Sequence, residues 1–130
     1  MLNLIDTPGH VDFNYEVRCS LAACQGAILV VDASQGVQAQ TVANFFLAFE
    51  RDMAIIPLIN KIDLPTASVP SSLKQMQTLF DMQPDTVLQV SAKKRINIEA
   101  ILPAVIERIP APSGKPQAAF RALLFDSTYR

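Results

Sequence analysis

Glycine is scarce in this sequence: the 130 residues include only four, and none has the spacing of a phosphate-binding loop. That loop reads GxxxxGK(S/T), because its backbone N–H groups cradle phosphates while the Lys and the Ser or Thr contact phosphate and Mg²⁺. The pair Gly114-Lys115 is followed by Pro116 and lies in a stretch rich in Pro, so we interpret it as a chance pair. Within this sequence, phosphate binding through a loop of this type is therefore excluded.

Cysteine and charge are also limited. The two cysteines, Cys19 and Cys24, lie on an Ala-rich stretch of helical character, and their spacing favours reduced thiols over a zinc site or a disulfide. The formal net charge is −1, so no basic excess predicts direct binding to DNA or to other nucleic acids. The longest apolar run, residues 27–31, is far too short to cross a bilayer. Met1 leads directly into an apolar run, so we expect no signal or transit segment.

What the sequence does contain is an alternation of buried strands and amphipathic helices. Short apolar runs predict strands at residues 2–5, 27–32, 53–59 and 87–90. Apolar residues at helical spacing predict helices between them, marked by Phe13, Val17, Leu21 and Cys24, then by Val42, Phe45, Phe46 and Phe49, and then by Leu73, Met76 and Phe80. This alternation predicts an α/β fold with a mainly parallel sheet and helices on both faces.

A last helix and a linker complete the chain. Asn97 can cap this helix. Its expected apolar face consists of Ile98, Ile101, Leu102, Val105 and Ile106. Pro103 lies inside the segment, where an interior proline costs about 3 kcal/mol, so we expect a kink there. The composition of residues 110–117 turns to Pro, Ser and Gly, which predicts a linker, and residues 118–125 are typical of a further strand.

The stretch Asp6-Thr7-Pro8-Gly9-His10 follows the first predicted strand, and ligands of open α/β sheets bind at this carboxyl edge. The Asp6 carboxylate suits Mg²⁺, directly or through a water molecule, because Mg²⁺ prefers hard oxygen ligands. Gly9 has no Cβ, so its amide can approach a phosphate oxygen closely, and His10 follows beside it. Taken alone, the stretch is equally typical of an ordinary turn with Pro at its second position.

A second stretch, Asn60-Lys61-Ile62-Asp63, follows the third predicted strand and favours the recognition of guanine. Asn60 can donate to the N7 and O6 edge of guanine, while Asp63 can accept from the N1 and 2-amino groups. Adenine would leave a buried Asp63 unpaired, and this penalty is a source of selectivity. The methylene stem of Lys61 can lie along the base.

The third stretch, Ser91-Ala92-Lys93, follows the fourth predicted strand. A tight turn there can aim backbone amides at O6, and Lys93 can cover the other face of the ring. Simpler explanations exist, because Asn60 and Asp63 readily form Asx turns and Ser91 can lead a helix. They would have to coincide for all of the stretches, each after its own strand, so we interpret the stretches as one nucleotide site.

Together these stretches resemble the third, fourth and fifth guanine-nucleotide motifs of GTPases, and His10 has the form found in translational GTPases. Within that superfamily the chain is most similar to the LepA-type group, elongation factor 4 and its mitochondrial counterpart. The similarity is carried by His10-Val11-Asp12-Phe13-Asn14-Tyr15-Glu16-Val17, Gly36-Val37-Gln38-Ala39-Gln40-Thr41, Asn60-Lys61-Ile62-Asp63-Leu64-Pro65 and Ala122-Leu123-Leu124-Phe125-Asp126-Ser127. It implies a P-loop-GTPase-like domain at residues 1–109, from the second switch onward, which lacks the first strands and the P-loop. The 110–117 linker and the start of a β-barrel-type second domain at residues 118–130 follow.

For the complete protein, the resemblance implies a ribosome-associated GTPase that hydrolyses GTP to GDP and phosphate with Mg²⁺ and promotes back-translocation and fidelity of protein synthesis. It assigns His10 to orienting the attacking water and Asp6 to holding Mg²⁺ through water. The GTP-binding residues that it implies are Asp6, Thr7, Pro8, Gly9, His10, Asn60, Lys61, Ile62, Asp63, Ser91, Ala92 and Lys93. The P-loop and first switch would precede residue 1, so the alternative is a catalytically inactive guanine-binding or interaction fragment.

Residues 44–50 look more like the mitochondrial members than the bacterial ones. This favours the mitochondrial matrix, peripheral to the inner membrane, over a bacterial cytoplasm. In the family a further strand lies between residues 2–5 and 27–31. We therefore expect this chain alone to be aggregation-prone or partly ordered, with residues 27–109 better protected from hydrogen exchange than residues 1–26.

Overall fold

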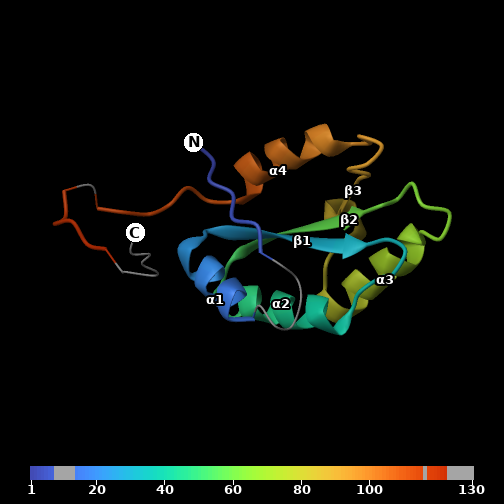
Figure 1. The fold of residues 1–130 in the computed structure, drawn as a ribbon, viewed down its shortest axis with the longest axis horizontal. Coiled ribbons are helices and arrows are strands. Elements are labelled where there is room, and N and C mark those ends of the chain that lie inside the picture. The colour runs from blue at the N-terminus through green and yellow to red at the C-terminus, as the bar shows by residue number, and fades with distance from the viewer. Residues whose placement is uncertain (8–13, 116, 123–130) are drawn as a thin grey trace, which may run out of the picture.

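The computed structural model describes residues 1–7, 14–115 and 117–122. A sheet of three parallel strands lies at its centre, in the order β1-β2-β3. The strands are β1 (Gly26–Asp32), β2 (Ala54–Asn60) and the short β3 (Leu88–Gln89). β2 lies between the other two (Figure 1). Its residues 56–59 are buried, as a nearly continuous apolar run predicts for a central parallel strand.

Helices cover both faces of this sheet. In the described part of the chain they are α1 (Asn14–Ala23), α2 (Ala39–Phe49), α3 (Val69–Phe80) and α4 (Ile101–Arg108), with 3₁₀ turns η2 (Pro84–Thr86) and η3 (Ile98–Ala100). Figure 1 shows α4 on one face and α1, α2 and α3 on the other. The predicted α/β class with a mainly parallel sheet is confirmed. None of the described helices is long and apolar enough to cross a membrane.

The largest part of the core lies between the sheet and helices α2 and α3. Its buried members are Val31, Ala33, Phe45, Ile59, Met76, Phe80 and Val87. Phe45 of α2 and Phe80 of α3 stack with their ring centroids 4.2 Å apart. On the sheet side, the register pairs Asp32 with Asn60, the last residues of β1 and β2. The polar residues that follow these strands therefore begin at the same edge of the sheet.

The prediction of a strand at residues 2–5 is wrong. Residues 1–7 belong to no helix or strand, and Leu2, Leu4 and Ile5 are 57%, 87% and 47% exposed. A strand needs a neighbour to pair its backbone N–H and C=O groups, and among the described residues β1 pairs with β2 alone. The predicted fourth strand is shortened to the two residues of β3. Of the strand predicted at residues 118–125, residues 118–122 form no strand and residues 123–125 lie outside the described part of the chain.

The start of the last helix also differs from the prediction. Asn97 adopts a φ of 55° and its Nδ2 donates to the Gln89 carbonyl oxygen at 3.1 Å, so it does not cap the helix. α4 begins at Ile101, after the 3₁₀ turn, which places Pro103 in the first helical turn. N–H groups of that turn have no intrahelical acceptor, so the proline removes no hydrogen bond and the expected kink is not required.

The predicted apolar helix faces are only partly buried. Val17, Phe45, Met76 and Phe80 lie in the interior as predicted. The exposed exceptions are Phe46 (46%), Phe49 (63%), Ile98 (37%), Leu102 (60%) and Ile106 (69%). Helical spacing identifies the apolar side of a helix, but neighbouring elements decide how much of that side is covered. Cys19 and Cys24 are half-buried free cysteines, and Phe13 lies outside the described residues.

Candidate functional site

A pocket of about 250 Å³ lies at the carboxyl edge of the sheet, where the segments after β2 and β3 meet. It is lined by Asn60, Lys61, Asp63, Leu64, Ser91, Ala92 and Lys93. The second and third predicted stretches therefore come together in space, although they are separated in the sequence by a helix. Ile62 is half-buried, and its backbone N–H donates to the Val90 carbonyl oxygen at 3.4 Å, which ties the two segments together.

Asn60 connects the two pocket-forming segments through one oxygen atom. Its Oδ1 accepts from the backbone N–H of Lys61 at 2.8 Å and from that of Ala92 at 3.1 Å. The Asn60 side chain keeps its amide hydrogens, which are donors, for a ligand. We expected the backbone amides of this turn to be aimed at O6, but the Ala92 amide is used within the protein. Ala92 thus holds Asn60 in place.

Ser91 is buried and holds the Asp63 carboxylate by a hydrogen bond. Ser91 is fully buried (0% exposed), and its hydroxyl donates to Asp63 Oδ1 at 2.6 Å while accepting from the Lys94 backbone N–H at 3.1 Å. The hydroxyl is the main cause that lowers the pKa of Asp63, and Lys93 and Lys94 add to it against the opposing effect of desolvation. The pocket therefore presents an ionised carboxylate, which accepts hydrogen bonds and donates none.

Lys61 has a left-handed backbone conformation, and its ammonium group pairs with the carboxylate of Asp32. Its φ is 63°, in the left-handed region, and its Nζ lies 2.6 Å from Asp32 Oδ2. Asp32 Oδ1 in turn accepts from the Ser34 backbone N–H at 2.8 Å and from its hydroxyl at 2.6 Å. Desolvation raises the pKa of Asp32, but the bonds from Lys61 and Ser34 outweigh it and lower the pKa to about 2.

Asp32 was not among the site residues predicted from the sequence. The signal was available, because Asp32 ends a strand in the same way as the residues that were selected, at the same edge of the sheet.

The first predicted stretch is mostly outside the described residues. Asp6 is exposed and Thr7 is half-buried, whereas Pro8, Gly9 and His10 lie outside the described part of the chain. No group of three or more metal-ligating side chains occurs among the residues that the structure describes. Asp6 by itself offers one carboxylate, which suits a water-mediated contact with Mg²⁺. The magnesium and phosphate assignments therefore stay predictions.

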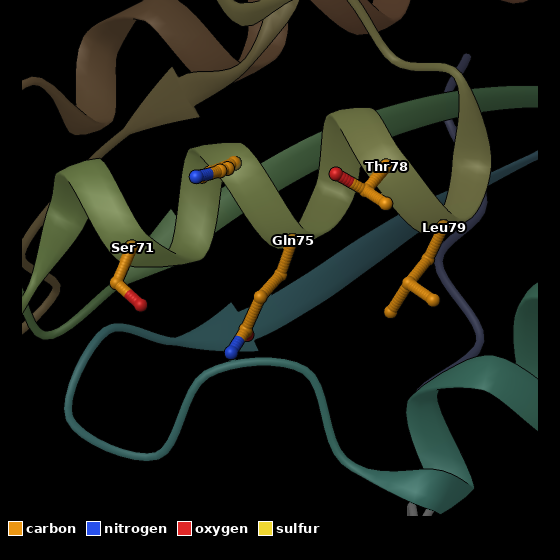
Figure 2. Close-up of a pocket in the computed structure, with 5 residues that line it drawn as sticks. Ser71, Gln75, Thr78 and Leu79 are labelled. Atoms are coloured by element: carbon orange, nitrogen blue, oxygen red, sulfur yellow. The ribbon is translucent and has the colours of Figure 1, made fainter.

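A second pocket, of about 300 Å³, lies along α3 (Figure 2). All of its lining residues, Ser71, Lys74, Gln75, Thr78 and Leu79, come from that one helix. Gln75 is already used, since its Oε1 accepts from the backbone N–H of Val37 at 2.8 Å. Binding sites are typically built from polar groups that converge from several elements. The pocket at the sheet edge meets this description and the one on α3 does not.

Comparison with known families agrees with this geometry. Residues 1–111 match the family described as the Elongation factor Tu GTP binding domain. The chain belongs to this family. The predicted P-loop-GTPase-like fold is confirmed, and the family description implies binding of a guanine nucleotide.

Individual relatives are similar over almost the whole chain. It is 64% identical to "Translation factor GUF1 homolog, mitochondrial" of Sorghum bicolor, with 99% of this chain and 19% of the relative covered. The protein of the same name from Trichoplax adhaerens is 61% identical, with 99% and 20% covered. "Translation factor GUF1, mitochondrial" of Yarrowia lipolytica is 58% identical over the same shares. The chain thus spans about a fifth of the length of these relatives, and the predicted resemblance to the mitochondrial LepA-type group is confirmed.

Proposed function

We propose that this chain is the guanine-recognition part of a mitochondrial translation-factor GTPase. The observation that carries the proposal is the pocket in which Asn60 and Asp63 from one segment meet Ser91 and Ala92 from another. The complete protein would hydrolyse GTP to GDP and phosphate on the ribosome and would support back-translocation and fidelity of protein synthesis. Relatives whose names include translation factor and mitochondrial support this assignment.

The chemistry of the pocket suits guanine better than adenine. Guanine has donors at N1 and at the 2-amino group, and the ionised Asp63 carboxylate accepts from both. Asn60 donates from its amide to N7 or O6, because its oxygen is already occupied. Adenine has an acceptor at N1 and no 2-amino group, so the carboxylate would be desolvated without a donor from the base. The side chains of Lys61 and Lys93 line the pocket and would cover the faces of the base.

The phosphate side of the reaction rests on the first stretch. There we assign Asp6 to Mg²⁺ through water, Gly9 to the γ-phosphate and His10 to the attacking water, with Thr7 and Pro8 beside the nucleotide. Mg²⁺ would neutralise charge on the phosphates when bound. Because the sequence has no GxxxxGK(S/T) loop, the chain alone binds GDP weakly and does not turn GTP over.

The proposed cellular location of the complete protein rests on the same relatives. We place the complete protein in the mitochondrial matrix, in contact with the ribosome and peripheral to the inner membrane. The names of the relatives support the mitochondrion over a bacterial cytoplasm. Fractionation of mitochondria with an antibody to this chain tests the placement, and recovery of the complete protein outside the mitochondrion would contradict it.

A nucleotide titration followed by NMR tests the proposal. The wild-type chain should bind GDP more tightly than ADP, with the largest shifts at the amides of Ala92 and Lys93. In Asp63→Asn the affinity for GDP should fall at least about tenfold, because a hydrogen bond to a charged group is lost. XDP, which carries oxygen at position 2, should gain relative to GDP. Asp85→Asn, the same change at an exposed position away from the pocket, is the control.

Turnover tests whether the chain by itself hydrolyses GTP, and base preference separates guanine recognition from the alternative of an interaction fragment. Single-turnover assays with labelled GTP, with and without ribosomes, should show only background hydrolysis by this chain. Turnover that disappears in His10→Ala would contradict the dependence on a phosphate loop. Equal binding of GDP and ADP by the wild type would contradict guanine recognition and favour the interaction fragment.

A further inference from the structure

We propose that Asp32 is a positioning residue of the guanine pocket, which holds the Lys61 side chain in place before a nucleotide arrives. This inference rests on the proposed function, because it assigns a role in the same pocket. Asp32 does not line the pocket and would not touch the nucleotide. It acts through its ion pair with Lys61, whose Nζ lies 2.6 Å from Asp32 Oδ2.

Asp32 is itself fixed with respect to the pocket. It is the last residue of β1 and lies in register with Asn60, and the next residue, Ala33, donates from its N–H to the Asn60 carbonyl oxygen at 2.9 Å. Both oxygen atoms of Asp32 have partners: Oδ1 accepts from the Ser34 N–H and hydroxyl, and Oδ2 faces Lys61. Its side chain is only 19% exposed. The carboxylate is therefore a fixed anchor at the end of a strand.

Lys61 needs such an anchor because its side chain is long and 54% exposed. An unrestrained lysine samples many rotamers, and ordering it on binding weakens affinity. Here the backbone N–H is bound to Asn60 Oδ1 at 2.8 Å, and the ammonium at the other end is bound to Asp32. The methylene stem is thus fixed at both ends while it lines the pocket. Loss of this preorganisation should weaken nucleotide binding about two- to tenfold.

A purely structural ion pair would behave differently. A structural pair stabilises the fold but leaves the GDP affinity of the folded chain unchanged. The bonds that lower the pKa of Asp32 to about 2 stabilise the folded chain at neutral pH, so Asp32→Asn should lower the unfolding midpoint at pH 7 whether or not Asp32 has a positioning role. A loss of GDP affinity in the folded variant is therefore the result that identifies a positioning role. The effect should also depend on Lys61 alone, because Asp32 reaches the pocket through that side chain.

A double-mutant cycle on the full chain tests the inference, with GDP, IDP and ADP as the probes in NMR titrations. Asp32→Asn keeps the shape and the bonds to Ser34 but loses the charge, and it should weaken GDP binding about two- to tenfold. IDP lacks the 2-amino group but offers the same ring face, so its affinity should fall by the same factor. In the Lys61→Met background, which keeps the stem and removes the ammonium, Asp32→Asn should have no further effect. Asp81→Asn, exposed at the end of α3, is the control.

Each contrary result has a separate meaning. Unchanged GDP affinity in Asp32→Asn, in a wild type that prefers GDP to ADP, would overturn the positioning role. An equal loss in the Lys61→Met background would overturn the route through Lys61. Absence of any preference for GDP in the wild type would overturn the proposed function, and this inference with it.

If Asp32→Asn does not fold, side-chain relaxation of Lys61 in the wild type gives an independent test. The stem should be ordered without GDP and no more ordered after its addition. A freely rotating stem in the absence of GDP would overturn the inference.

Discussion

Lys61 offers a test in which the same two substitutions report separately on backbone strain and on nucleotide binding. Its φ of 63° lies in the left-handed region, which costs a residue with a Cβ about 1–2 kcal/mol. We predict that Lys61→Gly is more stable than Lys61→Ala. Both variants nevertheless lose a side chain that lines the pocket, so both should bind GDP more weakly than the wild type.

The size of the stability difference follows from comparing the two variants with each other. Both lose the ion pair with Asp32, so that contribution cancels. Glycine relieves about 1–2 kcal/mol of backbone strain in the folded state, but its greater freedom in the unfolded chain removes about 0.4–1 kcal/mol of this gain. The net difference lies between about 0 and 1.6 kcal/mol in favour of Lys61→Gly, with a central value of about 0.8 kcal/mol. For a urea m value of about 2 kcal/mol/M, the unfolding midpoint should be higher by about 0.3–0.5 M.

Urea unfolding of the full chain, followed by circular dichroism, measures this difference. Lys74 is the matched control, because it is an exposed lysine within α3. There the order should reverse, with Lys74→Gly less stable than Lys74→Ala by about 0.8–1 kcal/mol. A Lys61→Ala variant at least as stable as Lys61→Gly would refute the strain at this position. GDP affinity equal to that of the wild type in both variants would refute the role of the side chain.

Three further predictions concern the pocket, the loop after β1 and the amino-terminal segment. The Ser91 hydroxyl lowers the pKa of Asp63 in the folded chain, and this stabilises the fold at any pH above the unfolded pKa of about 3.9. The contribution is lost as the pH falls through the folded pKa. Ser91→Ala should therefore lower the urea midpoint more at pH 7 than at pH 3. Gly36→Ala should destabilise by at least about 1–2 kcal/mol, because φ is 70° and the new Cβ would lie 2.5 Å from Gln75 Oε1; the loss in thermal unfolding should be smaller in a Gln75→Ala background. In hydrogen exchange, residues 1–7 should exchange as an unfolded peptide while β2 is the most protected element, and protection of residues 2–5 in a monomer would contradict the absence of a strand there.

The sequence was sufficient for the order of elements from α1 onward and for the meeting of the segments after β2 and β3. β1 and β2 are nearly continuous apolar runs, and α2 and α3, which follow them, bury Phe45, Met76 and Phe80 at helical spacing. Parallel strands all end at one edge of the sheet, so Asn60 and Ser91 were expected to meet there. These features depend on local composition and on the period of the chain, which can be read without coordinates.

The tertiary structure alone decided which groups pair within the pocket and which apolar runs pair at all. Ser91 reaches Asp63 across 28 residues and Ala92 reaches Asn60 across 32 residues, so the bonds that fix the carboxylate and the amide depend on how the β2 and β3 ends are placed. The Asp32 ion pair likewise joins the ends of two strands. Residues 2–5 are as apolar as a strand but form none, because a strand is defined by hydrogen bonds to a neighbour and not by its own composition.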